Sequence, residues 1–405
     1  MTAVQQELRR LQGQPADVIA RHFFDNFGVV AQSHLDGQLW LFDYDQLAAH
    51  KHRTTEVVME SRGLVIDSET HEVVRRPFAR FFNIGEAAAY EANIDYARLE
   101  ALEKADGSLV TLYFNDRTGH WHFGTRGTPF ADSNHRLGGR FHERVSKAAA
   151  LPCKAGTDEF DVAVQQTKAT PDTTYLFEFI GPDNPHVTPH PVSELVYLGA
   201  RRRDGVELTA EENQAFFDSI VGRWNVRLPK RYPVPVKLDG LTRVQQIEAI
   251  KAWVASDPEF KGLHEGVVCY DPVTGKRLKV KTPLYCAAHL QGDSLSTNLS
   301  KSRIVELIVN GDAEEFCLYV PTLAPLVQRA EAQVAEFLES LAPVWNEVKG
   351  IEDQKSFALA LQSKVRGDGT SLFFLARKTG TSPQEAWLSL PFNKKVSMAE
   401  RVVDV

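Results

Sequence analysis

One change of pattern divides this chain and limits what it can fold into. Residues 40–282 consist mostly of short apolar runs, rich in β-branched and aromatic residues and separated by turns, which is the pattern of β-strands. After about Gln291, apolar residues recur every three or four positions to the end of the sequence, which is the pattern of helices. The sequence therefore predicts two domains, 1–290 and 291–405, with a boundary near 285–300.

Turn signals indicate how the strands of the first region pair. Asn, Asp, Pro and Gly gather in the segments 115–119 and 271–275, each between two apolar runs, and such turns favour antiparallel hairpins. Two further stretches, Thr209–Val221 and Arg243–Ala255, have helical spacing. The predicted fold class is α+β, with a domain of antiparallel sheets followed by an all-helical C-terminal domain.

The charge of the chain limits its partners. The 405 residues carry a formal net charge of -7, which argues against a uniformly basic coat for nucleic acid. A polyanion would need a local basic surface. Three basic runs are candidates, although each taken singly is better explained as a solvated strand end: Arg75-Arg76, Arg201-Arg202-Arg203 and Lys276-Arg277. No apolar run approaches the roughly 18 residues of a membrane span, so we expect a soluble, cytoplasmic protein that binds no membrane.

A lysine in an unusual setting is the strongest candidate for chemistry. Lys104 begins the segment Lys-Ala-Asp-Gly-Ser, just before the strand-like run 108–114, and Gly107 would allow a close backbone approach that a side chain would block. An amine attacks phosphorus only when it is neutral, and an ordinary lysine is almost wholly protonated near pH 7. Lys279 and Lys281, at alternate strand positions, would place two cations on one sheet face, favour the neutral amine and hold a phosphate.

Six segments in order now point to one family. The chain resembles the ATP-dependent RNA ligases of the phage RNA ligase 1 type, within the covalent nucleotidyltransferases. The segments are 61–63 (Ser-Arg-Gly), 76–83 (Arg-Pro-Phe-Ala-Arg-Phe-Phe-Asn), 104–110 (Lys-Ala-Asp-Gly-Ser-Leu-Val), 177–179 (Phe-Glu-Phe), 265–268 (Glu-Gly-Val-Val) and 279–281 (Lys-Val-Lys). The second segment is characteristic of RNA ligases rather than DNA ligases. DNA ligases and capping enzymes also continue into a small barrel, whereas this sequence continues into helices.

The resemblance implies a role for each matching residue. Lys104 would be the nucleophile that becomes lysyl-AMP, and Glu178, a carboxylate in an otherwise apolar strand, would act at the nucleotide site. Lys279 and Lys281 would hold the α-phosphate. Glu265 would support Mg²⁺, and Glu314 falls near an acidic metal contact of the C-terminal domain.

Four further residues complete the nucleotide site that the resemblance implies. Arg62 and Arg80 would contact phosphates, although the family commonly has a lysine at the second position, and a guanidinium differs from an ammonium in shape. Arg126 stands where the family has a basic residue after the nucleophile strand. Tyr44 resembles a tyrosine of the family's nucleotide pocket.

Two weaker signals concern histidines and a tyrosine. His120 and His122 share a strand face, but no third metal ligand stands at a telling spacing, so we interpret them as surface or packing residues. Tyr197 is equally compatible with stacking on adenine and with a place in the core.

The function implied is ATP- and Mg²⁺-dependent sealing of 5′-phosphate to 3′-hydroxyl RNA ends, with a single-stranded or nicked-loop RNA as partner, as in RNA or tRNA repair, by a protein expected to be a monomer. Two alternatives stay open. The enzyme could transfer AMP to DNA ends, or the chain could be a catalytically silent module that binds nucleic-acid ends. The sequence has no G-x-x-x-x-G-K-[ST] phosphate loop, so it does not predict a fused kinase.

Overall fold

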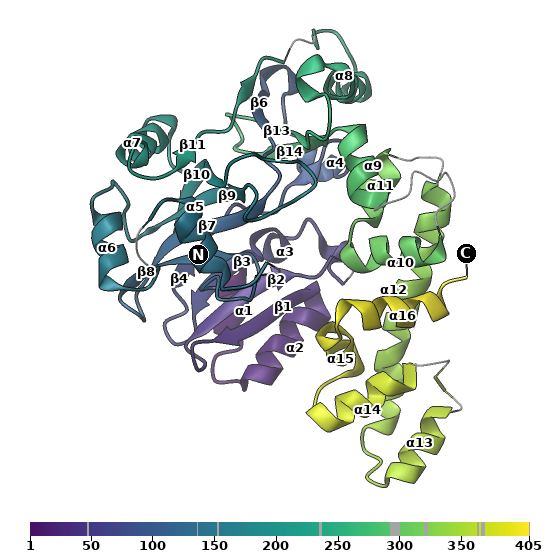
Figure 1. Cartoon of the computed structure of the whole chain (residues 1–405). Helices are drawn as coiled ribbons and strands as arrows, with labels where there is room; N and C mark the ends of the chain where they lie inside the picture. The colour runs from purple at the N-terminus through teal and green to yellow at the C-terminus, as the bar shows by residue number, and fades with distance from the viewer. Residues whose placement is uncertain are drawn as a thin grey trace. The chain divides into compact units, whose positions relative to one another are not determined.

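The computed structural model describes residues 1–46, 48–135, 137–151, 154–234, 237–291, 300–319, 323–362, 364–365 and 369–404. The chain divides into two compact units, Met1–His289 and Leu290–Val405, which run from purple to green and from green to yellow (Figure 1). Residues 292–299 of the predicted junction lie outside the described part. Among the described helices, none has the length and apolar character needed to cross a membrane.

Three sheets form the first unit. Sheet 1 has the order β1 (Val29–His34), β2 (Leu39–Tyr44), β3 (Arg62–Asp67), β4 (Val73–Arg75). Sheet 2 has the order β11 (Val226–Arg227), β10 (Glu194–Arg202), β9 (Thr173–Ile180), β7 (Ser108–Asn115), β8 (His120–Thr125). Sheet 3 has the order β12 (Arg231–Tyr232), β6 (Glu100–Glu103), β13 (Gly266–Tyr270), β14 (Arg277–Lys281), β5 (Phe82–Asn83). Pairing is antiparallel except for the short edge pairs β10–β11 and β5–β14.

Helices and short 3₁₀ turns surround these sheets. They are α1 (Ala3–Arg10), α2 (Ala16–Phe27), η1 (His50–His52), α3 (Glu56–Glu60), α4 (Ala88–Glu91), η2 (Tyr96–Arg98), α5 (Phe141–Ala148), α6 (Asp158–Gln165), α7 (Ala210–Ile220), α8 (Arg243–Ser256), η3 (Pro258–Phe260) and α9 (Pro283–Gln291). Helices α7 and α8 begin at capping boxes set by Thr209 and Thr242, which satisfy free N–H groups of the first turn.

Each of sheets 2 and 3 buries one face in its own core, and this fixes where the polar side chains point. In β9, Tyr175, Phe177 and Phe179 pack into the core of sheet 2 together with residues of α5, α6 and α7. In β14, Leu278 and Val280 pack into the core of sheet 3 together with residues of α8. Because side chains alternate along a strand, the residues between these positions lie on the opposite faces of both sheets.

The second unit is helical. It contains α10 (Lys301–Asn310), α11 (Ala313–Tyr319), α12 (Ala324–Val348), α13 (Gln354–Gln362), α14 (Thr370–Thr379), α15 (Pro383–Ser389) and α16 (Phe392–Val402). The predicted α+β class, with antiparallel sheets followed by helices, is confirmed, as are both predicted hairpins and the helices near residues 209–221 and 243–255. The sequence analysis named two helical stretches among the strands and missed short helices such as α5 and α6, whose eight residues give a weak periodic signal.

Candidate active site

The nucleophile candidate lies where sheet 3 brings distant segments together. Lys104 directly follows β6, and its backbone N–H donates to the carbonyl of Gly266 at 3.0 Å. Its Nζ lies 2.7 Å from Oε1 of Glu265, and Nζ of Lys281 lies 3.6 Å from the same oxygen. Glu265 is buried, with 4% of its surface exposed. A buried carboxylate thus holds two predicted site lysines close together.

The rest of the lysine motif fixes the loop in place. A Cβ on Gly107 would lie 2.3 Å from the carbonyl oxygen of Phe179, so the predicted close backbone approach is confirmed. The carboxylate of Asp106 is buried and accepts the backbone N–H of Thr188 at 2.7 Å and the hydroxyl of Tyr285 at 2.9 Å. These bonds tie the nucleophile loop to the loop after β9 and to α9. The sequence offered no signal for the role of Tyr285.

Glu178 faces this lysine cluster from sheet 2. It alternates with the core residues of β9 and therefore lies on the opposite face. Loss of water around the carboxylate raises the pKa of Glu178 to about 8; the positive charges of Lys104 and Arg62 oppose this rise, and the negative charge of Glu265 adds to it. The surroundings of Glu178 therefore disfavour its ionised form.

Tyr44 marks a second cluster, in which positive charge predominates. The guanidinium carbons of Arg80 and Arg126 lie 4.3 and 4.4 Å from the centre of its ring. Burial raises the pKa of the Tyr44 phenol, but the charges of Arg126, Arg80, Arg62 and Lys279 outweigh burial and hold that pKa below its usual value. The structure brings all five of these predicted residues together.

The arginines of this cluster differ in their hydrogen bonds. Arg126 donates Nε to both carboxylate oxygens of Asp43, at 2.8 and 2.9 Å. By contrast, Nη1 of Arg62 and Nη1 of Arg80 are buried and have no hydrogen-bond partner among the described residues. A buried donor without a partner costs about 1–3 kcal/mol, so both groups suit an anion that reaches them. Arg62 and Lys279 both lie near the Phe81 ring, at 5.4 and 5.7 Å from its centre.

A cavity of about 570 Å³ lies between sheets 2 and 3, further along the same face of β14. Arg277 lies two residues before Lys279, so both side chains share that face. The guanidinium of Arg277 stacks 3.8 Å from the ring centre of Phe78 and donates to both carboxylate oxygens of Glu207, at 2.8 and 2.7 Å. Leu198 and other apolar residues also line the cavity. Its size suits a nucleobase and sugar.

The predicted metal ligands lie in different units. Glu265 belongs to the lysine cluster described above. Glu314 lies on α11 of the second unit and is partly buried. Their role toward Mg²⁺ stays a prediction.

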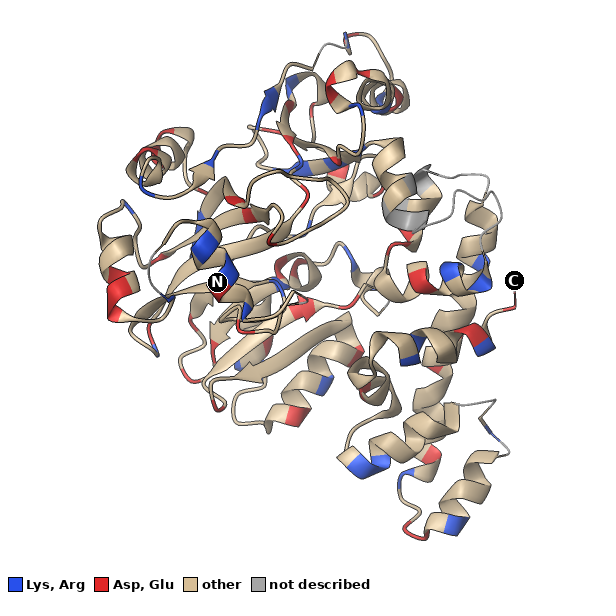
Figure 2. Cartoon of the chain, in the orientation of Figure 1, with Lys and Arg blue, Asp and Glu red and all other residues tan. Residues whose placement is uncertain are grey.

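The three basic runs are not exposed patches. The interpretation as a solvated strand end is wrong for Arg75-Arg76, which is buried, whereas the other two runs are partly buried. Arg75 is fully buried and donates to the carbonyls of Gly63 and Thr128. The others form ion pairs and bonds within the unit: Arg76 with Glu60, Arg201 with the Pro77 carbonyl, Arg202 with Glu212, Arg203 with Asp116, Lys276 with the Tyr90 carbonyl and Arg277 with Glu207. Figure 2 shows basic and acidic residues interspersed along the chain.

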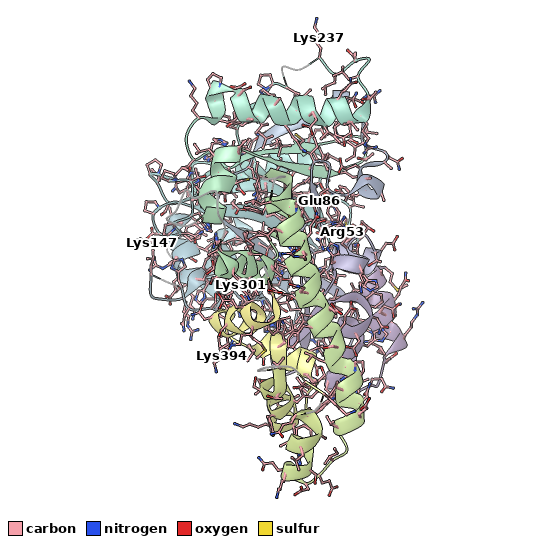
Figure 3. All side chains as sticks on the ribbon, turned by 90° about the vertical axis from the view of Figure 1, so that its right-hand side faces the viewer. Arg53, Glu86, Lys147, Lys237, Lys301 and Lys394 are labelled. Atoms are coloured by element: carbon pink, nitrogen blue, oxygen red, sulfur yellow. The ribbon has the colours of Figure 1, made fainter. Side chains whose placement is uncertain are left out.

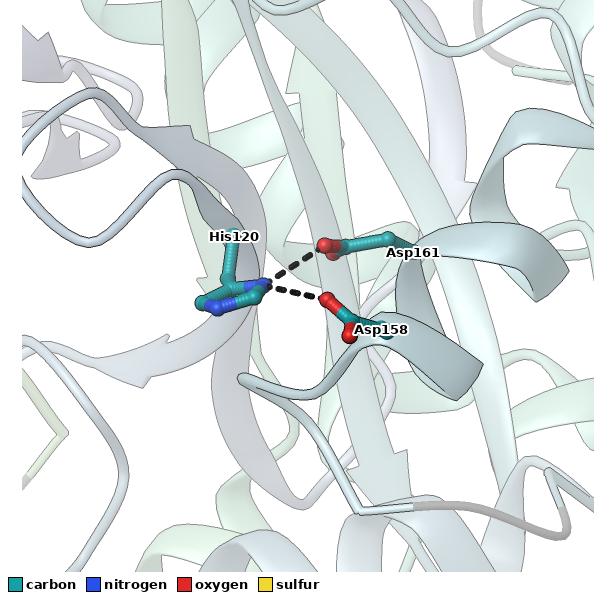
Figure 4. A group of neighbouring side chains, drawn as sticks. All are labelled: His120, Asp158 and Asp161. Carbon is teal, nitrogen blue, oxygen red and sulfur yellow. Dashed lines mark hydrogen bonds and ion pairs between the residues drawn. The ribbon is translucent and has the colours of Figure 1, made fainter.

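The weaker sequence signals prove to be structural. Tyr197 is 2% exposed and donates its hydroxyl to Asn213 at 2.6 Å within the core of sheet 2, which supports the core interpretation, and it also lines the cavity beside Arg277. His120 lies beside Asp158 and Asp161 of α6 (Figure 4), a grouping that the sequence spacing did not show. Asp161 accepts from the His120 ring at 2.7 Å and from the backbone N–H of Trp121 at 2.8 Å. These two bonds join β8 to α6, and this structural role explains why the three side chains lie together.

Comparison with known proteins identifies the family. The sequence model of a family described as RNA ligase matches residues 60–285. A protein of Autographa californica nuclear polyhedrosis virus, named for polynucleotide kinase and RNA ligase activities, is 26% identical over 323 residues, which cover 76% of this chain and 41% of the viral protein. The chain thus matches about two fifths of the length of that relative.

Solved structures of RNA ligases are more distant. Form 2 of an archaeal ATP-dependent RNA ligase has a TM-score of 0.44 at 17% identity, covering 89% of each chain. A Naegleria gruberi RNA ligase with pyrophosphate has a TM-score of 0.37 at 16% identity, covering 52% of this chain and 57% of its own. The family match alone spans more than half of the sequence, and the chain therefore belongs to the RNA ligase family.

Proposed function

We propose that this protein is an ATP-dependent RNA ligase that joins a 5′-phosphate to a 3′-hydroxyl through lysyl-AMP. The observation that carries the proposal is the contact between Lys104 and the buried carboxylate of Glu265, next to Lys281. The charges of both Lys104 and Arg62 act on Glu178, and Nη1 of Arg62 has no hydrogen-bond partner among the described residues. The carboxylate of Glu265 is placed to accept the proton that Lys104 must lose before it can attack as a neutral amine.

In the first step, Nζ of Lys104 attacks the α-phosphorus of ATP. A phosphorus–nitrogen bond forms, the bond from the α-phosphorus to the bridging oxygen breaks, and pyrophosphate leaves in line with the attacking amine. Glu265 holds the amine in place and is the nearest acceptor for its proton. Lys279 and Lys281 neutralise the α-phosphate, and Arg62 and Arg80 receive the leaving pyrophosphate with their free donors.

The residues around Lys104 fit a divalent cation. The negative charge of Glu265 disfavours ionisation of Glu178, and a divalent cation would offset that effect. Glu265 would hold the ion, and the assignment of Glu314 as a metal contact stays a prediction. When bound, Mg²⁺ would screen the negative charge of the phosphates.

The remaining steps use the same pocket. The 5′-phosphate of RNA attacks lysyl-AMP and displaces Lys104, and a 3′-hydroxyl then displaces AMP to form the phosphodiester. The cavity beside Arg277 would hold the adenosine through both steps. A role in cytoplasmic RNA repair, for example of a cleaved tRNA loop, and action as a monomer are part of this proposal.

One experiment tests the proposal against its alternatives. Purified protein is incubated with Mg²⁺ and ATP labelled at the α-phosphate, and then with 5′-phosphorylated single-stranded RNA or DNA. We expect labelled protein first and labelled RNA next. Transfer to DNA alone would indicate a DNA-end enzyme. Absence of labelled protein would support the silent end-binding alternative, which the intact cluster around Lys104 disfavours.

A further inference from the structure

Four consecutive basic side chains lie beside the cationic cluster and have no part in the mechanism above. They belong to the segment His50-Lys51-His52-Arg53, which consists of the η1 turn and the residue after it. His50 and Lys51 are exposed, and the other two residues are partly buried. Burial lowers the pKa of His50, and the charges of Arg53 and Arg80 lower it further, so this segment lies within electrostatic reach of Arg80.

Contacts tie this segment to the strand that carries the lysine pair. Nη2 of Arg53 donates to the carbonyl of Glu86 at 3.4 Å, and the two residues lie close together in Figure 3. The carboxylate of Glu86 accepts the backbone N–H and the side-chain amide of Asn83, at 2.7 and 2.8 Å. Asn83 in turn pairs with Lys279 across β5 and β14. The segment is therefore anchored at the edge of the site.

Charge near the segment favours an anion. Glu86 is the acidic group whose charge most opposes the lowered pKa of His50, but its carboxylate is already bonded to Asn83. Arg80 is 6% exposed, and its Nη1 has no hydrogen-bond partner among the described residues. A buried free donor next to the charged side chains of Lys51 and Arg53 is an arrangement that suits a chain of phosphates.

The geometry of the reaction decides which phosphates these are. Pyrophosphate leaves, and the RNA 5′-phosphate enters, on the side of the α-phosphorus opposite Lys104. Under the proposed function, in which Arg62 and Arg80 receive the pyrophosphate, the entering 5′-phosphate meets the same two arginines. ATP ends at its γ-phosphate, whereas an RNA strand continues with one phosphodiester per nucleotide. Cations beyond Arg80 can therefore find further phosphates only in RNA.

We propose that the segment His50–Arg53 binds the phosphodiester backbone that follows the 5′-phosphate of the RNA strand. This inference rests on the proposed function. The segment would be a binding site for nucleic acid that plays no part in the reaction with ATP.

The test compares Lys51→Gln, Arg53→Gln and the double variant with the matched control Lys147→Gln. Lys147 lies on α5, and its side chain is 74% exposed (Figure 3). Formation of lysyl-AMP from ATP is measured first. Preformed lysyl-AMP enzyme is then offered either a 5′-phosphorylated RNA of about 12 nucleotides or a nucleoside 3′,5′-bisphosphate, which has a 5′-phosphate but no phosphodiester.

We expect all variants to form lysyl-AMP and to transfer AMP to the bisphosphate within about twofold of the parent. The double variant should need about tenfold more of the longer RNA for half-maximal transfer. The slope of log affinity against log salt should fall by about 0.7 for each lost phosphate contact. The control variant should match the parent in every assay.

Two outcomes would overturn the inference. If the double variant loses lysyl-AMP formation from ATP as strongly as AMP transfer to RNA, the segment binds the ATP phosphates. If AMP transfer to the longer RNA is unchanged, the segment does not bind RNA. Equilibrium binding of the same RNA to the full-length proteins needs no chemistry, and equal affinity of the parent and the double variant would also overturn it. If the proposed function is wrong, the parent itself forms no lysyl-AMP.

Discussion

The site has two parts that differ in charge. We call the residues around Lys104 (Glu265, Lys281 and Glu178) the balanced half, and those around Tyr44 (Arg62, Arg80, Arg126 and Lys279) the cationic half. Around Lys104, each cation faces a carboxylate, since Glu265 contacts both Lys104 and Lys281, and Glu178 lies near. Around Tyr44, cations predominate, and buried donors of Arg62 and Arg80 lack partners among the described residues. In the balanced half, the carboxylate of Glu265 holds the amine of Lys104 in place even when no ligand is bound. In the cationic half, the free donors of Arg62 and Arg80 gain partners when an anion binds, which suits a phosphate-binding region.

The largest effect should come from the balanced half. Lys104→Ala should abolish labelled lysyl-AMP, a loss of at least about 1,000-fold, because no other group supplies the attacking amine. The side chain is 22% exposed, so the variant should stay folded. Sealing of RNA that is already adenylylated should persist, and it serves as the control. Labelled protein in the variant would rule out Lys104 as the nucleophile.

The next prediction separates the two lysines of β14. Lys281→Gln and Lys279→Gln should each slow formation of lysyl-AMP, by about 10- to 100-fold, because each removes a cation from the α-phosphate. Only Lys281 contacts Glu265 and belongs to the balanced half. Its loss should therefore make the rate depend more steeply on alkaline pH, because a cation near the amine has gone. The Lys279 variant should change the pH profile less.

Equal pH profiles for the two lysine variants would contradict this division of the site. The measurement is the single-turnover rate of lysyl-AMP formation from about pH 6 to 9, a range that spans the raised pKa of a desolvated carboxylate. A profile unchanged in both variants would mean that burial or the metal ion, rather than either lysine, keeps the amine reactive.

Both halves lie in the first unit, and this can be tested by truncation. Removal of everything after residue 295 should leave formation of lysyl-AMP within about threefold of the full chain and should change RNA joining, since the nucleotide-site residues come earlier in the sequence. Adenylylation and joining are measured separately on the purified fragment. A soluble fragment that cannot take AMP from ATP would show that the ATP site needs the helical unit, through Glu314 or another residue. Aggregation would indicate that the helices cover an apolar face.

The sequence predicted the site better than it predicted the surroundings of the site. Tyr44, Arg62, Arg80, Arg126 and Lys279 were proposed from scattered motifs, and the structure brings them together. Their catalytic roles stay predictions, as does the assignment of ATP chemistry to domain 1–290.

Long-range partners could not be predicted from the sequence. The bond from Tyr285 to Asp106 joins residues 179 positions apart, and no local pattern signals it. Buried arginines were missed for a similar reason. In the sequence, a run such as Arg75-Arg76 resembles an exposed strand end. The carbonyl that accepts from Arg75 and the carboxylate that pairs with Arg76 come from other segments and are brought near only by the fold.

The smallest expected effect concerns the stability cost of Glu178. Its folded pKa of about 8 lies above the ordinary 4.5, so between these values the folded protein keeps a proton that the unfolded chain has released. Stability therefore falls as pH rises through this window and levels off above it. Glu178→Gln does not titrate, so its gain in Tm over the parent should be near zero at pH 4.5 and should grow to about 3 °C at pH 8.

The difference in Tm between Glu178→Gln and the parent should also depend on Mg²⁺. If a divalent cation joins the carboxylates of the balanced half, it should favour ionised Glu178 and shrink the advantage of Glu178→Gln at pH 8. Arg126→Gln in the cationic half is the matched variant, and its difference in Tm from the parent should not respond to Mg²⁺ in this way. The measurement is thermal unfolding of the full chain at both pH values, with and without the ion. If the gain in Tm of Glu178→Gln over the parent is the same at every pH, Glu178 is ionised over the whole range. Another cation in the balanced half would then have to offset the charge of this carboxylate.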